Sequence, residues 1–344
     1  MKVEFRKIFL KKRFPLAISR GVHTGSENLF LSVEKEGITG WGELSPGKSE
    51  GADTTDQAQL SLESFLKNDI HSLSIQQIYD LAIEQALPLC ALAGLDIALW
   101  DWLGKKANLP LYQLLGINKP TVPTSVTIGI NPPEVVKERI PLLLDGTGIK
   151  SLKIKLGSPE GIEADQSMFN QVVESTKNYS VNLRVDANGG WDTGDAIKMM
   201  KWLAERNTDY VEQPLKEGDE SELPKIFKNR PLPIYVDESC RVSSNIKNWW
   251  QYVDGVNLKL MKCGGITEAL RILAVAKAYG MKTMIGCMGE SSMSISAAAA
   301  LTGIIDHVDL DSHLNLEPDP CNGATLEHGI IMPNDLPGHG TTFK

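Results

Sequence analysis

The sequence of 344 residues contains few cysteines, and no two of them are spaced for a metal or redox site. There are five cysteines, an odd number, and none forms a Cys-X-X-Cys pair. We therefore expect neither a disulfide framework nor a zinc site, and a reducing cytoplasm is the expected location.

Long apolar runs are also missing. The alanine-rich run Ala297–Leu301 is far too short to span a membrane. The first residues, Met1–Arg6, alternate charged and apolar side chains and contain no apolar stretch typical of a signal peptide. We expect neither a cleaved leader nor a membrane partner.

Basic residues are outnumbered by acidic ones. The chain has 35 Lys and Arg against 43 Asp and Glu, which gives a net charge of −8. This balance argues against nucleic acid as a partner. The hydrophobic content of 42% and the charged content of 23% are typical of a soluble globular protein. The length fits two domains, or one barrel with additions.

The first third of the chain predicts a small α+β unit. Two alternating runs, 29–34 and 38–43, are joined by Lys35-Glu36-Gly37, which is typical of a β-hairpin. Residues 54–115 follow helical periodicity, with Ser74 as a helix cap. The polar segment 14–28 contains Arg20, His23 and Ser26. We interpret this segment as a loop, either an ordinary surface loop or a lid over a site elsewhere.

After Pro120, strand-like and helical runs alternate. Eight strand-like runs with intervening helices favour a closed parallel barrel. An open doubly wound sheet is the alternative, but no GxGxxG follows the first strand. The eight runs are 124–130, 151–157, 181–188, 208–214, 233–239, 255–262, 282–289 and 308–313.

Three successive strands of this barrel end in a carboxylate. Asp186, Glu212 and Asp237 are separated by 26 and 25 residues, about one strand-helix unit each. Strand ends of one barrel meet at one rim, where active sites of such barrels are built. Converging carboxylates would repel one another without a cation, and oxygen ligands without His or Cys favour a hard ion. The sequence thus indicates a Mg²⁺ site.

Lysines stand within two of the apolar strand runs. Lys153 and Lys155 are two residues apart in the run 151–157, so their side chains share one face of the strand. They face either solvent or an active site, where crowding and partial burial would lower the pKa of an amine. Lys259 lies in the sixth run. If the second and sixth strands lie opposite each other, the lysines face each other across the metal. A proton next to a carboxylate could then leave on one face and return on the other.

These residues belong to motifs that resemble the enolase superfamily, specifically its muconate-lactonizing subgroup. The resemblance spans essentially the whole chain. The motifs are Lys153-Ile154-Lys155, Val185-Asp186-Ala187-Asn188 with Gly190-Trp191, Val211-Glu212-Gln213-Pro214, Val236-Asp237-Glu238-Ser239, and Asn257-Leu258-Lys259 with Gly264-Gly265.

The resemblance implies an α/β fold, a modified TIM barrel of the (β/α)7β type with an N-terminal α+β capping domain. The expected capping domain covers 1–118 and is completed by the tail 319–344, while the barrel covers 119–318. By the same resemblance a homo-oligomer is expected. The implied Mg²⁺ ligands are Asp186, Glu212 and Asp237, and the implied catalytic lysines are Lys155, Lys259 and Lys153. Lys155 and Lys259 are the expected acid/base pair, and Lys153 is their electrostatic partner.

Within the subgroup, Asp309-Leu310-Asp311 resembles the DxD motif of dipeptide epimerases, which binds a free α-ammonium. The resemblance also implies Thr127, Cys287 and Arg20 as substrate contacts, in addition to Lys153. Arg20 is similar to the arginine that meets the acidic side chain in L-Ala-D/L-Glu epimerases. Gly289 replaces a bulkier residue expected beside that pocket and implies a wider one.

The expected function is therefore Mg²⁺-dependent epimerisation of dipeptides, Ala-Glu or a related Ala-X, through an enediolate intermediate. The residue inverted is the second one, by proton transfer between two lysines. An N-succinyl or N-acyl amino acid racemase, or an o-succinylbenzoate synthase, is the alternative within the subgroup. A non-catalytic barrel that only binds ligands is the alternative from another class.

Overall fold

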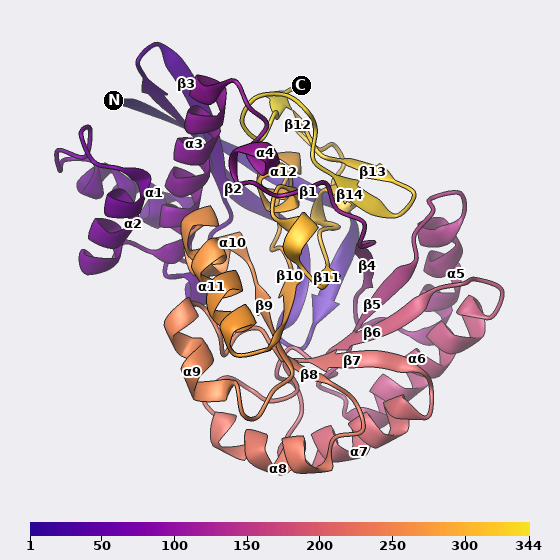
Figure 1. Ribbon diagram of the computed structural model, residues 1–344. Helices are drawn as coiled ribbons and strands as arrows, with labels where there is room; N and C mark the ends of the chain where they lie inside the picture. The colour runs from indigo at the N-terminus through magenta and orange to yellow at the C-terminus, as the bar shows by residue number, and fades with distance from the viewer.

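The computed structural model describes residues 1–344, and it places an antiparallel sheet with helices beside a β/α barrel (Figure 1). The sheet has the order β1 (Lys2–Ile18), β2 (Gly21–Lys35) and β3 (Ile38–Leu44). Four helices follow it: α1 (Thr55–Phe65), α2 (Ile75–Glu84), α3 (Leu89–Ala107) and α4 (Leu111–Leu114). As expected, Ser74 caps α2, in a capping box with Gln77.

Helix α3 packs directly on β3 because two glycines leave room for it. A Cβ atom built on Gly40 would lie 2.0 Å from the carbonyl oxygen of Ala98, and one on Gly42 would lie 2.0 Å from that of Gly94. Any side chain would force the helix and the sheet apart. These glycines therefore fix how the N-terminal unit is assembled.

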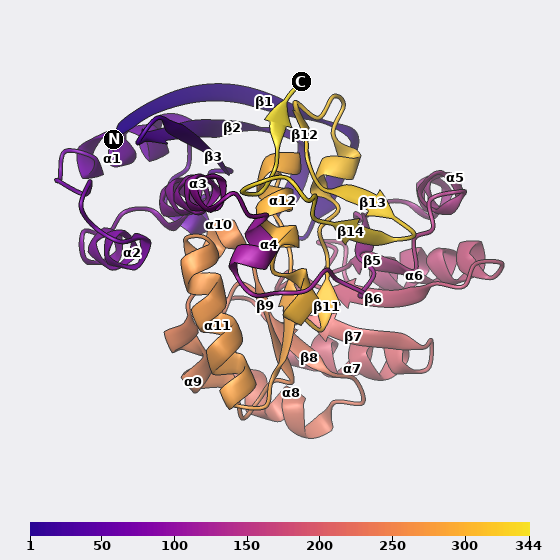
Figure 2. The ribbon, with the colours of Figure 1, turned by 45° about the horizontal axis from the view of Figure 1, so that its top comes forward.

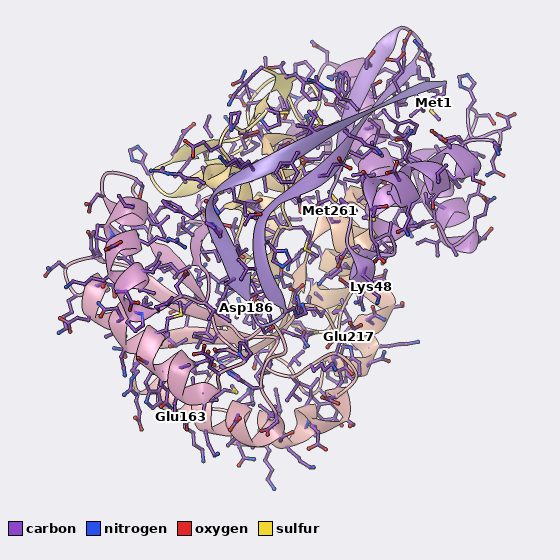
Figure 3. The ribbon with its side chains drawn as sticks, turned by 180° about the vertical axis from the view of Figure 1, so that it is seen from behind. Met1, Lys48, Glu163, Asp186, Glu217 and Met261 are labelled. Carbon is purple, nitrogen blue, oxygen red and sulfur yellow. The ribbon has the colours of Figure 1, made fainter.

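The interpretation of residues 14–28 as a loop is wrong. They belong to a long hairpin in which β1 pairs with β2 up to Ile18 and Gly21, with a register shift between Lys11 and Leu16. The irregular register hides the alternation by which a strand is recognised in sequence. Figure 3 shows the two strands bending away from the sheet, so that the end of the hairpin lies near Asp186.

The barrel confirms the fold class that the sequence predicted. All eight strands are parallel and follow one another in order, and a bridge between Thr124 and Val308 links the first strand to the last. The strands are β4 (Ser125–Ile128), β5 (Ser151–Lys155), β6 (Asn182–Asp186), β7 (Thr208–Glu212), β8 (Ile234–Val236), β9 (Gly255–Leu258), β10 (Lys282–Ile285) and β11 (His307–Val308).

Helices surround the barrel on the outside, as Figures 1 and 2 show. They are α5 (Pro133–Leu144), α6 (Ile162–Thr176), α7 (Thr193–Ala204), α8 (Leu223–Asn229), α9 (Ile246–Trp249), α10 (Leu260–Cys263), α11 (Ile266–Ala278) and α12 (Ser292–Ala299). None of the helices combines the length and apolar character needed to cross a membrane.

The C-terminal tail forms two small antiparallel sheets of two strands each. β12 (Cys321–Asn322) pairs with β15 (Thr342–Phe343), and β13 (Thr325–Glu327) pairs with β14 (Ile330–Met332). The ring of Phe343 lies 5.4 Å from that of Phe30 and 5.0 Å from that of Trp41. The end of the chain therefore packs against the N-terminal sheet.

Candidate active site

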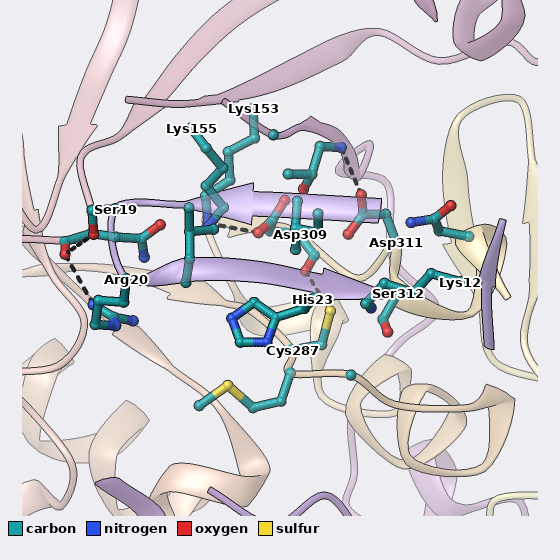
Figure 4. Close-up of a pocket in the computed structure, with 18 of the residues that line it drawn as sticks. Lys12, Ser19, Arg20, His23, Lys153, Lys155, Cys287, Asp309, Asp311 and Ser312 are labelled. Carbon is teal, nitrogen blue, oxygen red and sulfur yellow. Dashed lines mark hydrogen bonds and ion pairs between the residues drawn. The ribbon is translucent and has the colours of Figure 1, made fainter. Parts of the chain in front are cut away.

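A cavity of about 1140 Å³ lies between the β1–β2 hairpin and the barrel (Figure 4). All eight predicted lysine and substrate-binding residues line it. They are Arg20, Thr127, Lys153, Lys155, Lys259, Cys287, Asp309 and Asp311. The hairpin contributes the apolar residues Phe14, Leu16 and Ile18 beside polar ones such as Lys12 and His23. The hairpin and the polar barrel rim together form a site that suits a small amphiphilic molecule.

Three buried carboxylates converge behind the lysines that line this cavity. The strand register sets Lys155 beside Asp186 and Asp186 beside Glu212. One oxygen each from Asp186, Glu212 and Asp237 lies within 4.8 Å of the others, and all three residues are buried. Burial and the neighbouring Asp186 raise the pKa of Glu212 to about 8. Three buried carboxylates at this spacing fit a divalent cation with oxygen ligands.

Two lysines flank the carboxylates. Lys155 Nζ lies 2.5 Å from Asp186 Oδ2, and Lys259 Nζ lies 2.6 Å from Asp237 Oδ2. Lys155 ends strand β5, and Lys259 follows β9, four strands further around the barrel. The two amines therefore approach the carboxylates from opposite sides, as the sequence predicted from the barrel order.

Lys153 is fully buried, so its solvent-facing interpretation is wrong. Its Nζ lies 2.7 Å from Glu212 Oε2, 2.7 Å from Asp309 Oδ2 and 3.6 Å from Asp186 Oδ2. Burial lowers the pKa of Lys153, but Asp309, Glu212 and Asp186 raise it well above its ordinary value. Burial likewise lowers the pKa of Lys259, but Asp237 and Glu212 raise it. The expected lowering of lysine pKa by crowding is therefore not found at these two residues, because carboxylates surround them.

The DxD motif lies just beyond β11, across the cavity floor. Asp309 Oδ1 is buried and has no hydrogen-bond partner, while Asp309 Oδ2 accepts from Lys153. The backbone N–H of Thr127 donates to Asp311 Oδ2 at 2.6 Å. Burial and Asp309 raise the pKa of Asp311 to about 6. The pair thus offers free acceptor capacity for a cationic group.

Cys287 lies beside this pair without the features of a nucleophile. Its thiol donates to the backbone oxygen of Asp309 at 3.4 Å. Burial and Asp311 raise the pKa of Cys287 well above its ordinary value, so the thiol stays neutral. Cys287 therefore forms part of the cavity wall.

Arg20 lies at the turn of the hairpin and contacts the far rim. It donates to the backbone oxygen of Asn188 at 2.9 Å, and its other amino group lies 2.8 Å from Glu238 Oε1. Ser19 Oγ also donates to the Asn188 oxygen, at 2.9 Å. We call this contact between the hairpin and the rim the hairpin latch (Ser19, Arg20, Asn188 and Glu238).

Sequence reasoning missed Lys262, Glu238 and Asn188. Lys262 Nζ is buried and donates to Asp237 Oδ1 at 2.6 Å and to the Asn257 backbone oxygen at 2.7 Å. Asn188 donates to Asp186 Oδ2 at 3.1 Å. Each lies within three residues of a predicted metal ligand or catalytic lysine. This proximity in the sequence is the feature by which they could have been found.

Gly289 lines the cavity at a point where the hairpin meets the barrel. The backbone oxygen of Gly289 accepts hydrogen bonds from Asn28 Nδ2 at 2.6 Å and from Ser26 Oγ at 3.2 Å. A Cβ atom at this position would lie 2.8 Å from Ser26 Oγ. The glycine therefore allows the hairpin to approach the barrel closely.

Comparison with known proteins identifies relatives over the whole chain. Residues 2–116 match the mandelate racemase/muconate lactonizing enzyme N-terminal domain, and residues 136–344 match the enolase C-terminal domain-like family. A protein of Flavobacteria bacterium (strain MS024-2A), named hydrophobic dipeptide epimerase, is 65% identical over 100% of this chain and 99% of its own. One of Roseobacter litoralis with the same name is 58% identical over 99% of this chain and 98% of its own.

A solved structure agrees with the fold. The dipeptide epimerase of Enterococcus faecalis V583, complexed with Mg and the dipeptide L-Leu-L-Tyr, is 33% identical. It superimposes with a TM-score of 0.92 and covers 99% of both chains. The chain therefore belongs to the mandelate racemase/muconate lactonizing enzyme family of the enolase superfamily.

Proposed function

We propose that the protein is an isomerase that epimerises dipeptides at the α-carbon of their second residue and depends on Mg²⁺. The observation that carries this proposal is one site with three parts: a buried carboxylate cluster, a cavity-lining lysine on each side of it, and a cavity-lining DxD motif beyond it. The relatives named dipeptide epimerases support the same activity.

Mg²⁺ is the cation we propose for the three buried carboxylates. Asp186, Glu212 and Asp237 would hold it, and when bound it would stabilise negative charge that develops on the substrate carboxylate. Asn188 and Lys262 hydrogen-bond two of these carboxylates, so the ligands are held in place by neighbouring side chains.

Lys155 and Lys259 move the proton. With the substrate's α-carbon between them, one amine takes the proton from one face, and the other ammonium delivers a proton to the opposite face. Each lysine can act in either role, so both epimers are substrates and products. Lys153 adds a fixed positive charge next to Glu212 and stabilises the enediolate formed between the two steps.

Asp309 and Asp311 distinguish a dipeptide from an N-acylated amino acid. An α-ammonium group would gain charge-assisted hydrogen bonds from these carboxylates. An N-acyl or N-succinyl group has no positive charge there, and a succinyl carboxylate would be repelled. This argues against the racemase and synthase alternatives.

For the second residue we propose an apolar side chain in place of glutamate, within the Ala-X range. Arg20 is already paired with Glu238, so an acidic side chain would have to break that contact to reach it. The hairpin also lines the cavity with Phe14, Leu16 and Ile18, and these apolar side chains favour a hydrophobic side chain on the substrate. We propose that Thr127 and Cys287 contact the substrate as residues of the cavity wall.

Three further proposals concern organisation. We propose a capping domain of 1–118 completed by 319–344, and a barrel of 119–318, supported by the packing of Phe343 on the N-terminal sheet. We propose a cytoplasmic location, supported by five free cysteines. A homo-oligomer is proposed on the family resemblance.

Proton exchange in D₂O tests the proposed function. The protein is incubated with Mg²⁺ and with L-Ala-L-Leu, L-Ala-L-Glu or N-succinyl-L-leucine, and the α-proton is followed by ¹H NMR. We expect loss of the α-proton signal of the second residue and appearance of the epimer for L-Ala-L-Leu. Deuterium incorporated only into the N-succinyl compound would overturn the proposal.

A further inference from the structure

Lys12 is a buried cation in the cavity wall to which nothing above assigns a role. It lies on β1, where Leu10 and Lys12 point inward and are 1% and 9% exposed, while Lys11 and Arg13 face solvent. Its ammonium group makes no hydrogen bond and no ion pair with any residue of the chain. Because Lys12 lines the cavity, this unpaired ammonium group is available to a ligand that enters it.

The position of Lys12 is defined by its neighbours at the DxD end of the cavity. Its Nζ lies 3.8 Å from the place where a Cβ atom of Gly289 would be. Burial lowers the pKa of Lys12 below its ordinary value, and the Asp311 carboxylate opposes this lowering. Figure 4 shows Lys12 beside Ser312 and Asp311, at the opposite end of the drawn residues from Arg20.

This position places Lys12 near the first residue of a bound dipeptide. The substrate carboxylate lies at the metal ligands and the α-ammonium at Asp309 and Asp311, so the first residue lies at the DxD end. Its side chain then extends toward the cavity wall that contains Lys12. The reasoning rests on the proposed function, because it uses the orientation of a bound dipeptide.

We propose that Lys12 determines which first residues the enzyme accepts, by disfavouring cationic side chains and favouring neutral or acidic ones. A lysine or arginine side chain in this subsite would bring a second positive charge near an ammonium group in a poorly solvated place. A carboxylate side chain would instead find an unpaired donor.

The experiment compares L-Ala-L-Leu, L-Lys-L-Leu and L-Glu-L-Leu as substrates for the wild-type protein, Lys12→Met and Lys12→Glu. The readout is the ratio of kcat/KM values between dipeptides, which cancels any general loss of activity. Lys11→Met is the matched control, because Lys11 precedes Lys12 on the same strand and faces solvent. Circular dichroism verifies that each variant is folded.

We expect Lys12→Met to raise the L-Lys-L-Leu to L-Ala-L-Leu ratio by about tenfold, and Lys12→Glu to raise it further. The ratio for L-Glu-L-Leu should fall in both variants, and Lys11→Met should leave all ratios unchanged. If Lys12 only neutralises Asp311, all dipeptides will lose activity equally and the ratios will not move, which would overturn the inference. A wild-type protein that is inactive on every dipeptide would instead refute the proposed function.

Discussion

The hairpin latch gives a prediction that separates two roles for Arg20. Arg20→Met removes one ion pair, to Glu238 at 2.8 Å, and one hydrogen bond, to the Asn188 oxygen at 2.9 Å. The Arg20 side chain is 54% exposed, so the ion pair is worth only about 0.2–1 kcal/mol. The hydrogen bond adds about 0.5–1.5 kcal/mol. The closed hairpin should therefore lose roughly 1–2 kcal/mol, which is about a 5- to 30-fold change in equilibrium.

The assay for this prediction is steady-state epimerisation of L-Ala-L-Leu and L-Ala-L-Glu at saturating Mg²⁺. If Arg20 only closes the hairpin, KM rises by the same factor, roughly 5- to 30-fold, for both dipeptides. Glu238→Gln removes only the ion pair and should raise KM by no more than about 5-fold. The double variant should be no worse than Arg20→Met, because Arg20→Met already removes that ion pair.

A loss of activity confined to the acidic dipeptide would show that Arg20 binds the substrate directly. If Arg20 binds an acidic side chain, Arg20→Met will impair L-Ala-L-Glu strongly and leave L-Ala-L-Leu nearly unchanged. That result would refute the latch and restore the role that the family resemblance implies for this arginine.

Three other predictions follow from the site and the fold. Lys155→Ala and Lys259→Ala should each lower kcat by roughly 100-fold or more, and turnover retained by either variant in a polarimetric assay would exclude the two-lysine mechanism. The pKa of Asp311 is raised to about 6, and only its charged form binds an ammonium group. kcat/KM for L-Ala-L-Leu should therefore rise as the pH increases through about 6; Asp311→Asn should remove this step, and a step that persists would assign it elsewhere. Gly42→Ala should destabilise the fold by about 1–3 kcal/mol or more, because its Cβ would meet the Gly94 oxygen at 2.0 Å; an unchanged urea midpoint would contradict this packing argument.

The barrel was predictable because several of its strands end in a carboxylate residue that can be recognised in the sequence. Asp186, Glu212 and Asp237 recur at the spacing of one strand-helix unit, and parallel strands in register bring such residues together. The apolar runs are short and bounded, and buried parallel strands tolerate few polar residues except at functional positions. In the barrel, the spacing of the apolar runs and the carboxylates at their ends therefore predicted the same fold.

The hairpin was not predictable in the same way. The outer part of its second strand, residues 21–28, carries no hydrophobic alternation, and the register of the hairpin shifts between Lys11 and Leu16. The partners of Arg20 could not be found without the fold, because Glu238 and Asn188 follow two different strands far along the chain. Lys12 stands between Lys11 and Arg13, and the sequence does not distinguish it from these two basic neighbours.

A crystal structure with Mg²⁺ and L-Ala-L-Leu tests the central claim most directly. We predict that Asp186, Glu212 and Asp237 coordinate the metal, and that the α-carbon of leucine lies between the Nζ atoms of Lys155 and Lys259. Any of the three carboxylates turned away from the metal, or both amines on one face of the α-carbon, would contradict the account.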